Sequence, residues 1–137
     1  MTLLFDTNIV SELRRARRDN RALFEWRQSI GDLRKFISVI TILEIEFGAR
    51  RALWKAAPHA PNLRRWIDEQ VLVEFADAIL PVDVDVARQC AQLQVIRTLP
   101  HNDALIAATA LVYDLTLVTR NVRDFRNAGV RLLDPFA

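Results

Sequence analysis

Two aspartates each lie at the boundary of an apolar segment. Asp6 directly follows the apolar segment 3–5, and Asp103 opens the almost wholly apolar run 104–113. Helix capping would explain either residue alone, because a side-chain oxygen at a helix start accepts a backbone N–H. A carboxylate beside a buried helix is costly, however, unless it is paired or bound to a metal. We therefore expect Asp6 and Asp103 to share a divalent cation.

A third acid comes from the helix expected to follow the second strand. Glu44 and Glu46 both lie in this helix, but side chains two residues apart point about 200° away from each other. Only one of them can face the site. Glu46 is spaced to form a surface ion pair with Arg50, which leaves Glu44 as the residue we expect at the site.

A fourth position follows the apolar segment 116–119, where Asn121 and Asp124 both offer oxygen ligands. The pattern leaves the choice between them open. Three or four oxygens from separate segments suit a hard, octahedral cation such as Mg²⁺ or Mn²⁺ that keeps several waters. Zinc is disfavoured, because the chain has two histidines and a single cysteine.

The acids can meet only if the fold brings their segments to one edge. Short apolar runs alternate with longer periodic ones, which predicts an α/β fold with a mainly parallel sheet. The carboxyl ends of parallel strands form a common edge where ligands bind. We expect strands at these positions: 3–5, 36–39, 79–82, 116–119 and 131–133.

Helices are expected to begin near Thr41, at Asp83 or Asp85, and at Asn102 or Asp103. Asn62 is a plausible cap for another helix, placed between these. The chain shows no repeat and no linker, so residues 1–137 are predicted to form a single domain.

Composition sets limits on function. Hydrophobic residues make up 51% of the chain and charged residues 26%, and no apolar run is long enough to cross a bilayer. The first residues lack a basic segment, and the single cysteine is compatible with a reducing compartment. A cytoplasmic location without membrane contact is therefore expected. With three glycines, the chain also contains neither a P-loop nor a dinucleotide-binding motif.

The basic residues are almost all arginines, although the net charge is only +2. One group lies at Arg14, Arg15, Arg17 and Arg18, and Arg120 belongs to another. Guanidinium groups bind phosphates well, so these arginines are candidates for gripping RNA or an acidic partner. A solvated helix face explains the group at 14–18 equally well.

Four motifs in order along the chain resemble those of the PIN-domain family, and within it the VapC-like toxins of bacterial toxin–antitoxin pairs. The motifs are Leu-Phe-Asp-Thr-Asn at 4–8, the stretch 38–48 with Glu-Ile-Glu-Phe-Gly at its end, Asp-Ala-Leu-Ile-Ala-Ala-Thr-Ala at 103–110, and Val-Thr-Arg-Asn with Asp-Phe at 118–125. The resemblance covers almost the whole chain and implies a three-layer α/β/α fold.

The resemblance also implies roles for individual residues. Asp6, Glu44 and Asp103 would be the metal-binding acids, and Thr7 and Thr119 hydroxyls that orient them. The family's fourth acidic position falls on Asn121, which weakens the case for a second tightly held metal unless Asp124 supplies a carboxylate.

The function implied is that of a Mg²⁺- or Mn²⁺-dependent endoribonuclease, which cleaves single-stranded regions of RNA by metal-activated water. A cognate antitoxin and a second copy of the chain in a homodimer are the expected protein partners. The alternative is a PIN-fold binding module that is catalytically weak or inactive and acts by binding RNA or a protein partner.

Overall fold

The computed structural model describes residues 1–136, and at its centre is a five-stranded sheet in which every strand is parallel to its neighbours. The strand order is β3-β2-β1-β4-β5. The strands are β1 (Leu3–Phe5), β2 (Lys35–Ser38), β3 (Ile79–Leu80), β4 (Thr116–Val118) and β5 (Arg131–Leu133).

The first strand in the sequence is the middle strand of the sheet. Leu3 pairs with Lys35 of β2 on one side and with Thr116 of β4 on the other. All three residues of β1 are fully buried. A strand covered on both faces must be apolar throughout, which explains the unbroken segment Leu-Leu-Phe.

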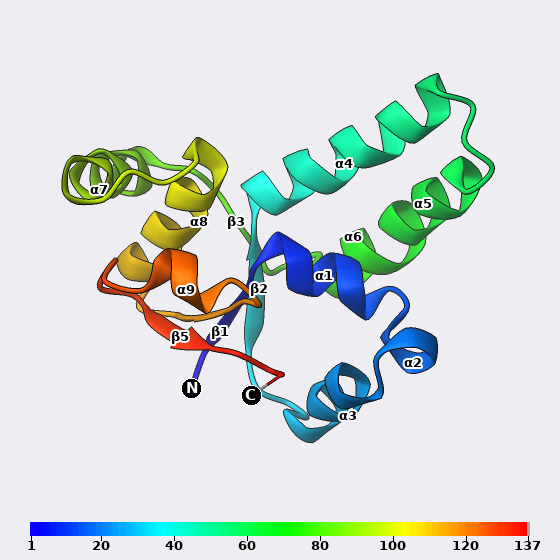
Figure 1. Cartoon of the computed structure of the whole chain (residues 1–137), viewed down its shortest axis with the longest axis horizontal. Coiled ribbons are helices and arrows are strands. Elements are labelled where there is room, and N and C mark those ends of the chain that lie inside the picture. Colours follow the sequence, from blue (N-terminus) through cyan, green and yellow to red (C-terminus); the bar gives the residue numbers. More distant parts are fainter. Residues whose placement is uncertain (137) are drawn as a thin grey trace.

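Helices cover both faces of the sheet, which Figure 1 shows nearly edge-on. One layer contains α1 (Thr7–Leu13), α2 (Ala16–Asp19), α3 (Arg21–Ser29), α4 (Val39–Trp54), α5 (Ala60–Trp66), the π-helical turn η1 (Ile67–Val71) and α6 (Leu72–Glu74). The other layer contains α7 (Val84–Ile96), α8 (His101–Val112) and α9 (Val122–Phe125). The predicted three-layer α/β/α arrangement is confirmed.

Each layer has its own apolar core, and the two cores share the sheet. Alternate residues of a strand point to opposite faces. Leu4 accordingly packs with α7 and α8, whereas Leu3 and Phe5 pack with α1, α4 and η1. Two core layers thus depend on one three-residue strand.

The apolar helix α8 is buried as its sequence predicts. Ala104, Ala107, Ala108 and Ala110 are each at most 1% exposed. Their small side chains allow α8 to lie close to α7 and to the sheet. This packing fixes the start of α8, and with it Asp103, at the carboxyl edge.

Helices α4 and α5 begin before the predicted positions. The long helix α4 starts at Val39 rather than near Thr41, because the Ser38 hydroxyl accepts a hydrogen bond from the Ile40 N–H at 3.0 Å and caps it. Strand β2 therefore ends at Ser38. Helix α5 starts at Ala60, so the prediction that Asn62 caps it is wrong; Pro61 occupies the first turn, where its missing N–H costs nothing.

The prediction that Asn102 or Asp103 caps α8 is also wrong. The helix starts at His101 behind Pro100, and both residues lie in its first turn. At α7 the expected cap is confirmed, because the Asp83 carboxylate accepts a hydrogen bond from the Val86 N–H at 2.8 Å.

Helix α4 leaves several large apolar side chains uncovered. Leu43, Phe47, Leu53 and Trp54 are exposed, Trp54 to 89%. Trp66, in contrast, is buried, and Trp26 packs against the core. Within residues 1–136 no helix combines the length and hydrophobicity that crossing a membrane requires.

Candidate active site

The candidate site lies at the carboxyl edge of the sheet. Asp6 comes directly after β1 and Thr119 directly after β4, the two strands paired at the centre of the sheet. The N-terminal ends of α1, α4 and α8 meet above this edge (Figure 1). This convergence brings together side chains that are more than 100 residues apart in sequence.

Asp6 is held by three hydrogen bonds. Its carboxylate accepts the Thr7 N–H at 2.8 Å, the Thr119 hydroxyl at 2.7 Å and the Asn8 amide at 3.2 Å. Burial raises the pKa of Asp6, as does the charge of Glu44, while the hydrogen bonds oppose the rise. Asp6 is only 3% exposed. It also caps α1, so the capping role and a place at the site are combined in one residue.

Thr7 connects Glu44 to Asp6, because it donates hydrogen bonds to both carboxylates. The Thr7 hydroxyl donates to Glu44 Oε1 at 2.6 Å, and Thr41 Oγ1 lies 2.9 Å from the same hydroxyl. Since the hydrogen of Thr7 is used on the carboxylate, Thr41 must be the donor in the second bond. The amide of Asn102 lies 3.5 Å from Glu44 Oε2.

Glu46 lies on another face of α4, as predicted. It pairs with Arg50 at 2.6 Å and with Arg64 of α5 at 2.7 Å. These hydrogen bonds lower the pKa of Glu46 to about 2. Glu46 therefore fastens α4 to α5, and Glu44 is the acid at the site.

The surroundings of Asp103 disfavour the ionised form of its carboxyl group. Burial, together with the negative charges of Asp6, Glu44 and Asp124, raises its pKa to about 6. Within residues 1–136 its carboxylate accepts no hydrogen bond and forms no ion pair. Its charge is therefore only partly compensated.

A divalent cation fits this donor set. In the described part of the chain, no lysine, arginine or histidine pairs with Asp6, Glu44 or Asp103. The charge of Glu44 raises the pKa of Asp6, and the charges of Asp6 and Glu44 raise that of Asp103. No three acidic, histidine or cysteine side chains in residues 1–136 are already gathered at coordination distance. Mg²⁺ commonly keeps several waters and binds through one or two carboxylates, so it does not need three carboxylates in direct contact.

Asn121 and Asp124 are the two candidates for the fourth position of the site. Asn121 is exposed, and its backbone N–H donates to the Thr119 hydroxyl at 3.0 Å. Asp124, in α9, lies close enough for its charge to raise the pKa of Asp103. The charge at this end of the site therefore comes from Asp124.

Three polar residues at the site were not singled out in the sequence. Asn8 donates to Asp6, and Thr41 and Asn102 contact Thr7 and Glu44. Asn8 could have been found from its place two residues after Asp6, and Asn102 from its place before Asp103. Thr41 sits one helical turn before Glu44, but it is fully buried, and only the packing of α4 on α1 brings it to Thr7.

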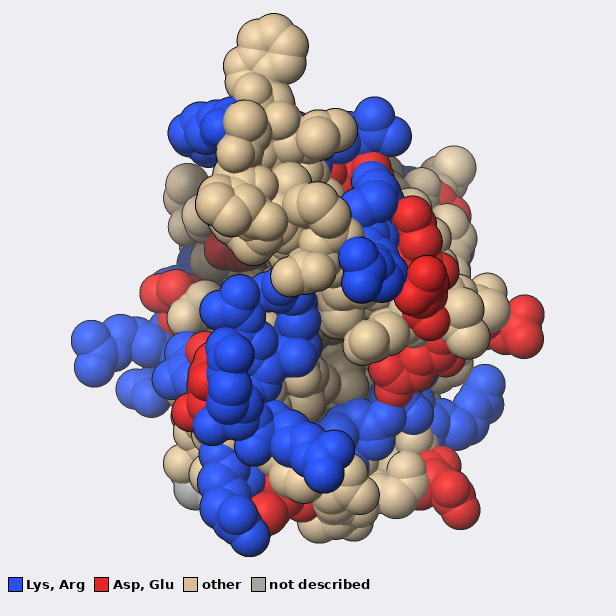
Figure 2. All heavy atoms as spheres, turned by 90° about the vertical axis from the view of Figure 1, so that its right-hand side faces the viewer, with Lys and Arg blue, Asp and Glu red and all other residues tan. Residues whose placement is uncertain are grey.

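The predicted RNA-binding arginines have two different environments. Arg120 pairs with Glu12 at 2.9 Å and stacks 3.8 Å from the ring centre of Phe136, so its guanidinium is already engaged. Arg14, Arg15, Arg17 and Arg18 line a surface depression of about 300 Å³ at the far end of α1. Figure 2 shows basic side chains gathered on that side of the molecule.

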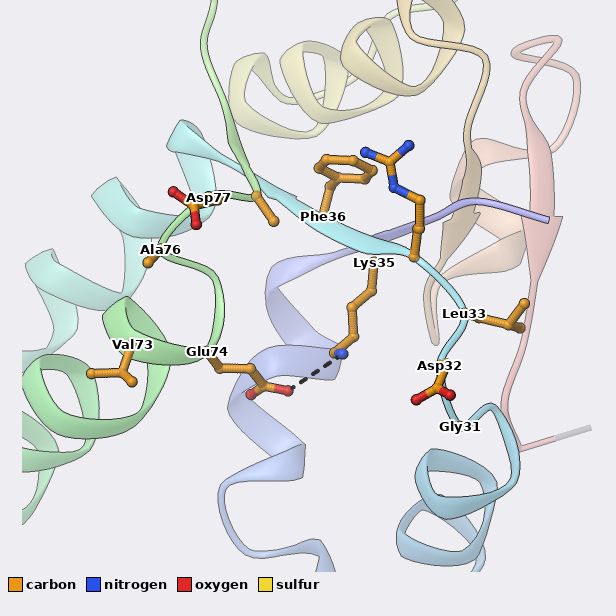
Figure 3. Close-up of a pocket in the computed structure, with 11 residues that line it drawn as sticks. Gly31, Asp32, Leu33, Lys35, Phe36, Val73, Glu74, Ala76 and Asp77 are labelled. Carbon is orange, nitrogen blue, oxygen red and sulfur yellow. Dashed lines mark ion pairs between the residues drawn. The ribbon is translucent and has the colours of Figure 1, made fainter.

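A larger hollow, of about 410 Å³, lies at the opposite end of β2 and contains none of the site residues (Figure 3). Lys35 crosses it toward Glu74 of α6, and Arg34 stacks on Phe36. Lys35 and Glu74, which form the ion pair, both line the hollow. Cys90 is buried as expected, and His101 is exposed at the start of α8.

Known proteins share this fold and length. The model of the PIN domain family matches residues 3–130. The VapC ribonuclease Y4jK of Sinorhizobium fredii is 31% identical over 98% of this chain and 97% of its own. A chain of the crystal structure of FitAcB from Neisseria gonorrhoeae is 31% identical, with a TM-score of 0.84 over 98% of this chain and 99% of that one.

A chain of a toxin–antitoxin complex from Klebsiella pneumoniae is 26% identical, with a TM-score of 0.70 over 98% of both chains. The family model spans the carboxylate positions at both ends of the site, from Asp6 to Asp124. The chain belongs to the PIN-domain family.

Proposed function

We propose that this protein is a metal-dependent endoribonuclease that acts as the toxin of a toxin–antitoxin pair. The observation that carries the proposal is the cluster of Asp6, Glu44 and Asp103, which is held at the sheet edge without a compensating basic side chain in residues 1–136. A relative named as a VapC ribonuclease, aligned over nearly the whole chain, supports RNA as the substrate.

Mg²⁺ or Mn²⁺ is the cofactor we propose, with Asp6, Glu44 and Asp103 as the carboxylates that would hold it, directly or through its bound waters. The donors are all carboxylate oxygens, which such hard cations prefer. Thr119 and Thr7 orient Asp6 and Glu44 through short hydrogen bonds. When bound, the cation would lower the pKa of a water and offset the negative charge that develops on the phosphate.

The protein side of the mechanism assigns separate tasks to the acids. Asp6 and Glu44 are fixed by hydrogen bonds and serve as anchors. Asp103, whose oxygens have no hydrogen-bond donor in residues 1–136, is the carboxylate able to align the attacking water and accept its proton. In-line attack of water on the phosphorus leaves a 5′-phosphate and a 3′-hydroxyl, which end-group analysis of the products would identify. A 2′,3′-cyclic phosphate would contradict this mechanism.

Asp124 is the fourth acid in our proposal. Its charge acts on Asp103, whereas Asn121 is neutral and uses its backbone to support Thr119. Replacing Asp124 by Asn should therefore reduce cleavage and raise the metal concentration for half-maximal activity more than replacing Asn121 by Ala.

The proposed partner is an antitoxin that covers the exposed apolar side of α4. Contiguous exposed apolar residues typically mark protein interfaces, and α4 exposes Leu43, Phe47 and Trp54. The Klebsiella pneumoniae complex supports a partner of this kind. Homodimer formation and a cytoplasmic location stay predictions, which sedimentation analysis and cell fractionation would test.

The decisive test is RNA cleavage by Asp103→Asn with Mg²⁺ or Mn²⁺ present. We expect cleavage to fall by at least about a hundredfold, because a carboxylate that acts on the attacking water is lost. The purified variant should remain folded, since the Asp103 side chain makes no hydrogen bond within residues 1–136.

Asp32→Asn is the matched control. Asp32 is exposed at the other end of the sheet, and its substitution removes the same charge. Full activity in Asp103→Asn, with full activity in the control, would overturn the proposed mechanism. Absence of cleavage and of Mn²⁺ binding in the wild-type protein would favour the alternative, a PIN-fold binding module.

A further inference from the structure

Arginines from separate parts of the chain meet at the end of α1 that is remote from the carboxylates. Arg14 is the C-cap of α1, Arg15 follows it, and Arg17 and Arg18 belong to α2. Arg65 comes from α5. These five residues are called the arginine cluster below. They gather on the face of the molecule shown in Figure 2.

Two adjoining depressions connect the members of the cluster. The first is lined by Arg14, Arg15, Arg17, Arg18 and Asn62. The second is lined by Arg14, Asn62, Arg65, Trp66, Glu69 and Gln70. Each has a volume of about 300 Å³, and Arg14 and Asn62 belong to both. The two depressions therefore form one continuous polar surface.

Most of the positive charge in the cluster is uncompensated. Within residues 1–136, Arg18 pairs with Asp19, whereas Arg14, Arg15, Arg17 and Arg65 form no ion pair. Arg14 is held 5.9 Å from the ring centre of Trp66. Burial lowers the pKa of Arg14, and the charges of Arg15 and Arg18 lower it further. Like charges gathered in this way favour binding of an anion with several charges.

The cluster suits a phosphate backbone better than an acidic protein segment. A protein interface is usually centred on apolar anchors that lose water, but the one aromatic residue here, Trp66, is only 8% exposed. Guanidinium groups with nearby amides from Asn62 and Gln70 supply the donors that phosphate oxygens accept. Such groups need no apolar centre.

The position of the cluster relates it to the carboxylate site. Helix α1 lies between its N-cap Asp6 and its C-cap Arg14, and eight residue steps of helix span about 12 Å. An RNA strand whose scissile phosphate lies at the carboxylates reaches the cluster within a few nucleotides. We propose that the arginine cluster is a second contact for the RNA backbone, which holds substrate on one side of the cleaved bond. This inference rests on the proposed ribonuclease function.

The test compares binding of a long and a short RNA. Fluorescence anisotropy would be measured with labelled single-stranded RNA of about 25 nucleotides and with a labelled dinucleotide, which is too short to reach the cluster from the carboxylates, at several salt concentrations. Asp103→Asn provides an uncleaving background. Arg15→Gln with Arg17→Gln removes two exposed charges of the cluster, and Arg51→Gln with Arg88→Gln removes two exposed charges elsewhere.

We expect the Arg15/Arg17 variant to bind the long RNA about five- to tenfold more weakly, with a slope of log K against log salt reduced by about 1.4, as two lost phosphate contacts predict. Binding of the short RNA and binding by the Arg51/Arg88 variant should change less than about twofold. An unchanged long-RNA affinity, or equal losses for both lengths, would overturn the inference.

The failure of this inference differs from failure of the proposed function. If wild-type protein cleaves RNA while the Arg15/Arg17 variant binds the long RNA normally, the ribonuclease function stands and the second contact does not. If the same variant instead loses affinity for a co-purified protein partner but not for RNA, the cluster is a protein-docking surface and the inference is wrong.

Discussion

The ionised carboxylate of Asp103 costs the folded protein free energy. Its pKa is raised to about 6, first by burial and then by the charges of Asp6, Glu44 and Asp124. In the unfolded chain the pKa returns to its ordinary value near 3.8. Because the folded pKa is the higher one, the ionised carboxylate destabilises the folded protein when no cation is bound.

This shift predicts how stability depends on pH. As pH rises from about 4 through about 6, the metal-free protein should lose about 1–2 kcal/mol of stability through Asp103, after allowance for its partial exposure. Asp103→Asn should lack this loss and be more stable than wild type at pH 7.5. Urea unfolding at pH 4.5 and 7.5 in a chelator would measure the difference.

Added Mn²⁺ provides the complementary measurement. It should stabilise the wild-type protein more at pH 7.5 than at pH 5, since the ligands must be ionised, and it should stabilise the variant little. A variant that is less stable than wild type at both pH values would show that Asp103 has a structural role instead.

The acids of the site could largely be predicted from local sequence. Asp6 and Asp103 each follow a recognisable boundary, and helical spacing separates Glu44 from Glu46. The partners that orient these acids could not be predicted from spacing. Thr119 reaches Asp6 across 113 residues, and Thr41 reaches Thr7 only because α1 and α4 pack together.

Helix α4 contains a feature that its own packing does not explain. Gly48 lies in the middle of this helix, and a Cβ added to it would meet no atom within 4 Å. Glycine in a helix interior costs about 0.5–1 kcal/mol relative to alanine, because it loses more backbone freedom on folding. The packing of residues 1–136 does not require a glycine at position 48, so it does not explain this loss of stability.

Gly48→Ala should therefore raise the free energy of unfolding by about 0.5–1 kcal/mol. Gly31→Ala is the control, since Gly31 also has free space but has a φ of +52°, where a side chain costs about 1–2 kcal/mol. Chemical denaturation should move the two variants in opposite directions. Destabilisation by Gly48→Ala would mean that the space at Gly48 is used within the folded chain.

Element types were easier to predict than their ends or their neighbours. Strong apolar runs give all five strands and the long helices. Caps decide the ends, and Ser38 starts α4 earlier than its periodicity suggests. The apolar residues Leu43, Phe47 and Leu53 share the expected helix, but they are exposed, because periodicity does not say which face meets the sheet.

At the scale of the whole molecule, the sheet joins two cores that cannot form separately. Leu4 packs in one core, and Leu3 and Phe5 pack in the other. Loss of β1 from the sheet would expose both. The chain should therefore unfold as one cooperative unit.

Its aromatic residues make this cooperativity measurable. All three tryptophans lie in the helical layer that contains α3, α4 and α5, whereas far-UV circular dichroism reports on both layers. The two signals should follow a single urea transition with the same midpoint. A fluorescence midpoint at lower urea would show that the α3–α5 layer unfolds on its own.

The central position of β1 also has a consequence for synthesis of the chain. A ribosome makes β1 and Asp6 long before residues 116–118, the neighbour that β1 needs on its second side. The Thr119 hydroxyl that holds Asp6 follows directly afterwards. A nascent chain that has not reached Thr119 thus carries Asp6 without this support. The carboxylate centre is therefore complete only after Thr119 has been made, and translation products that stop before β4 lack it.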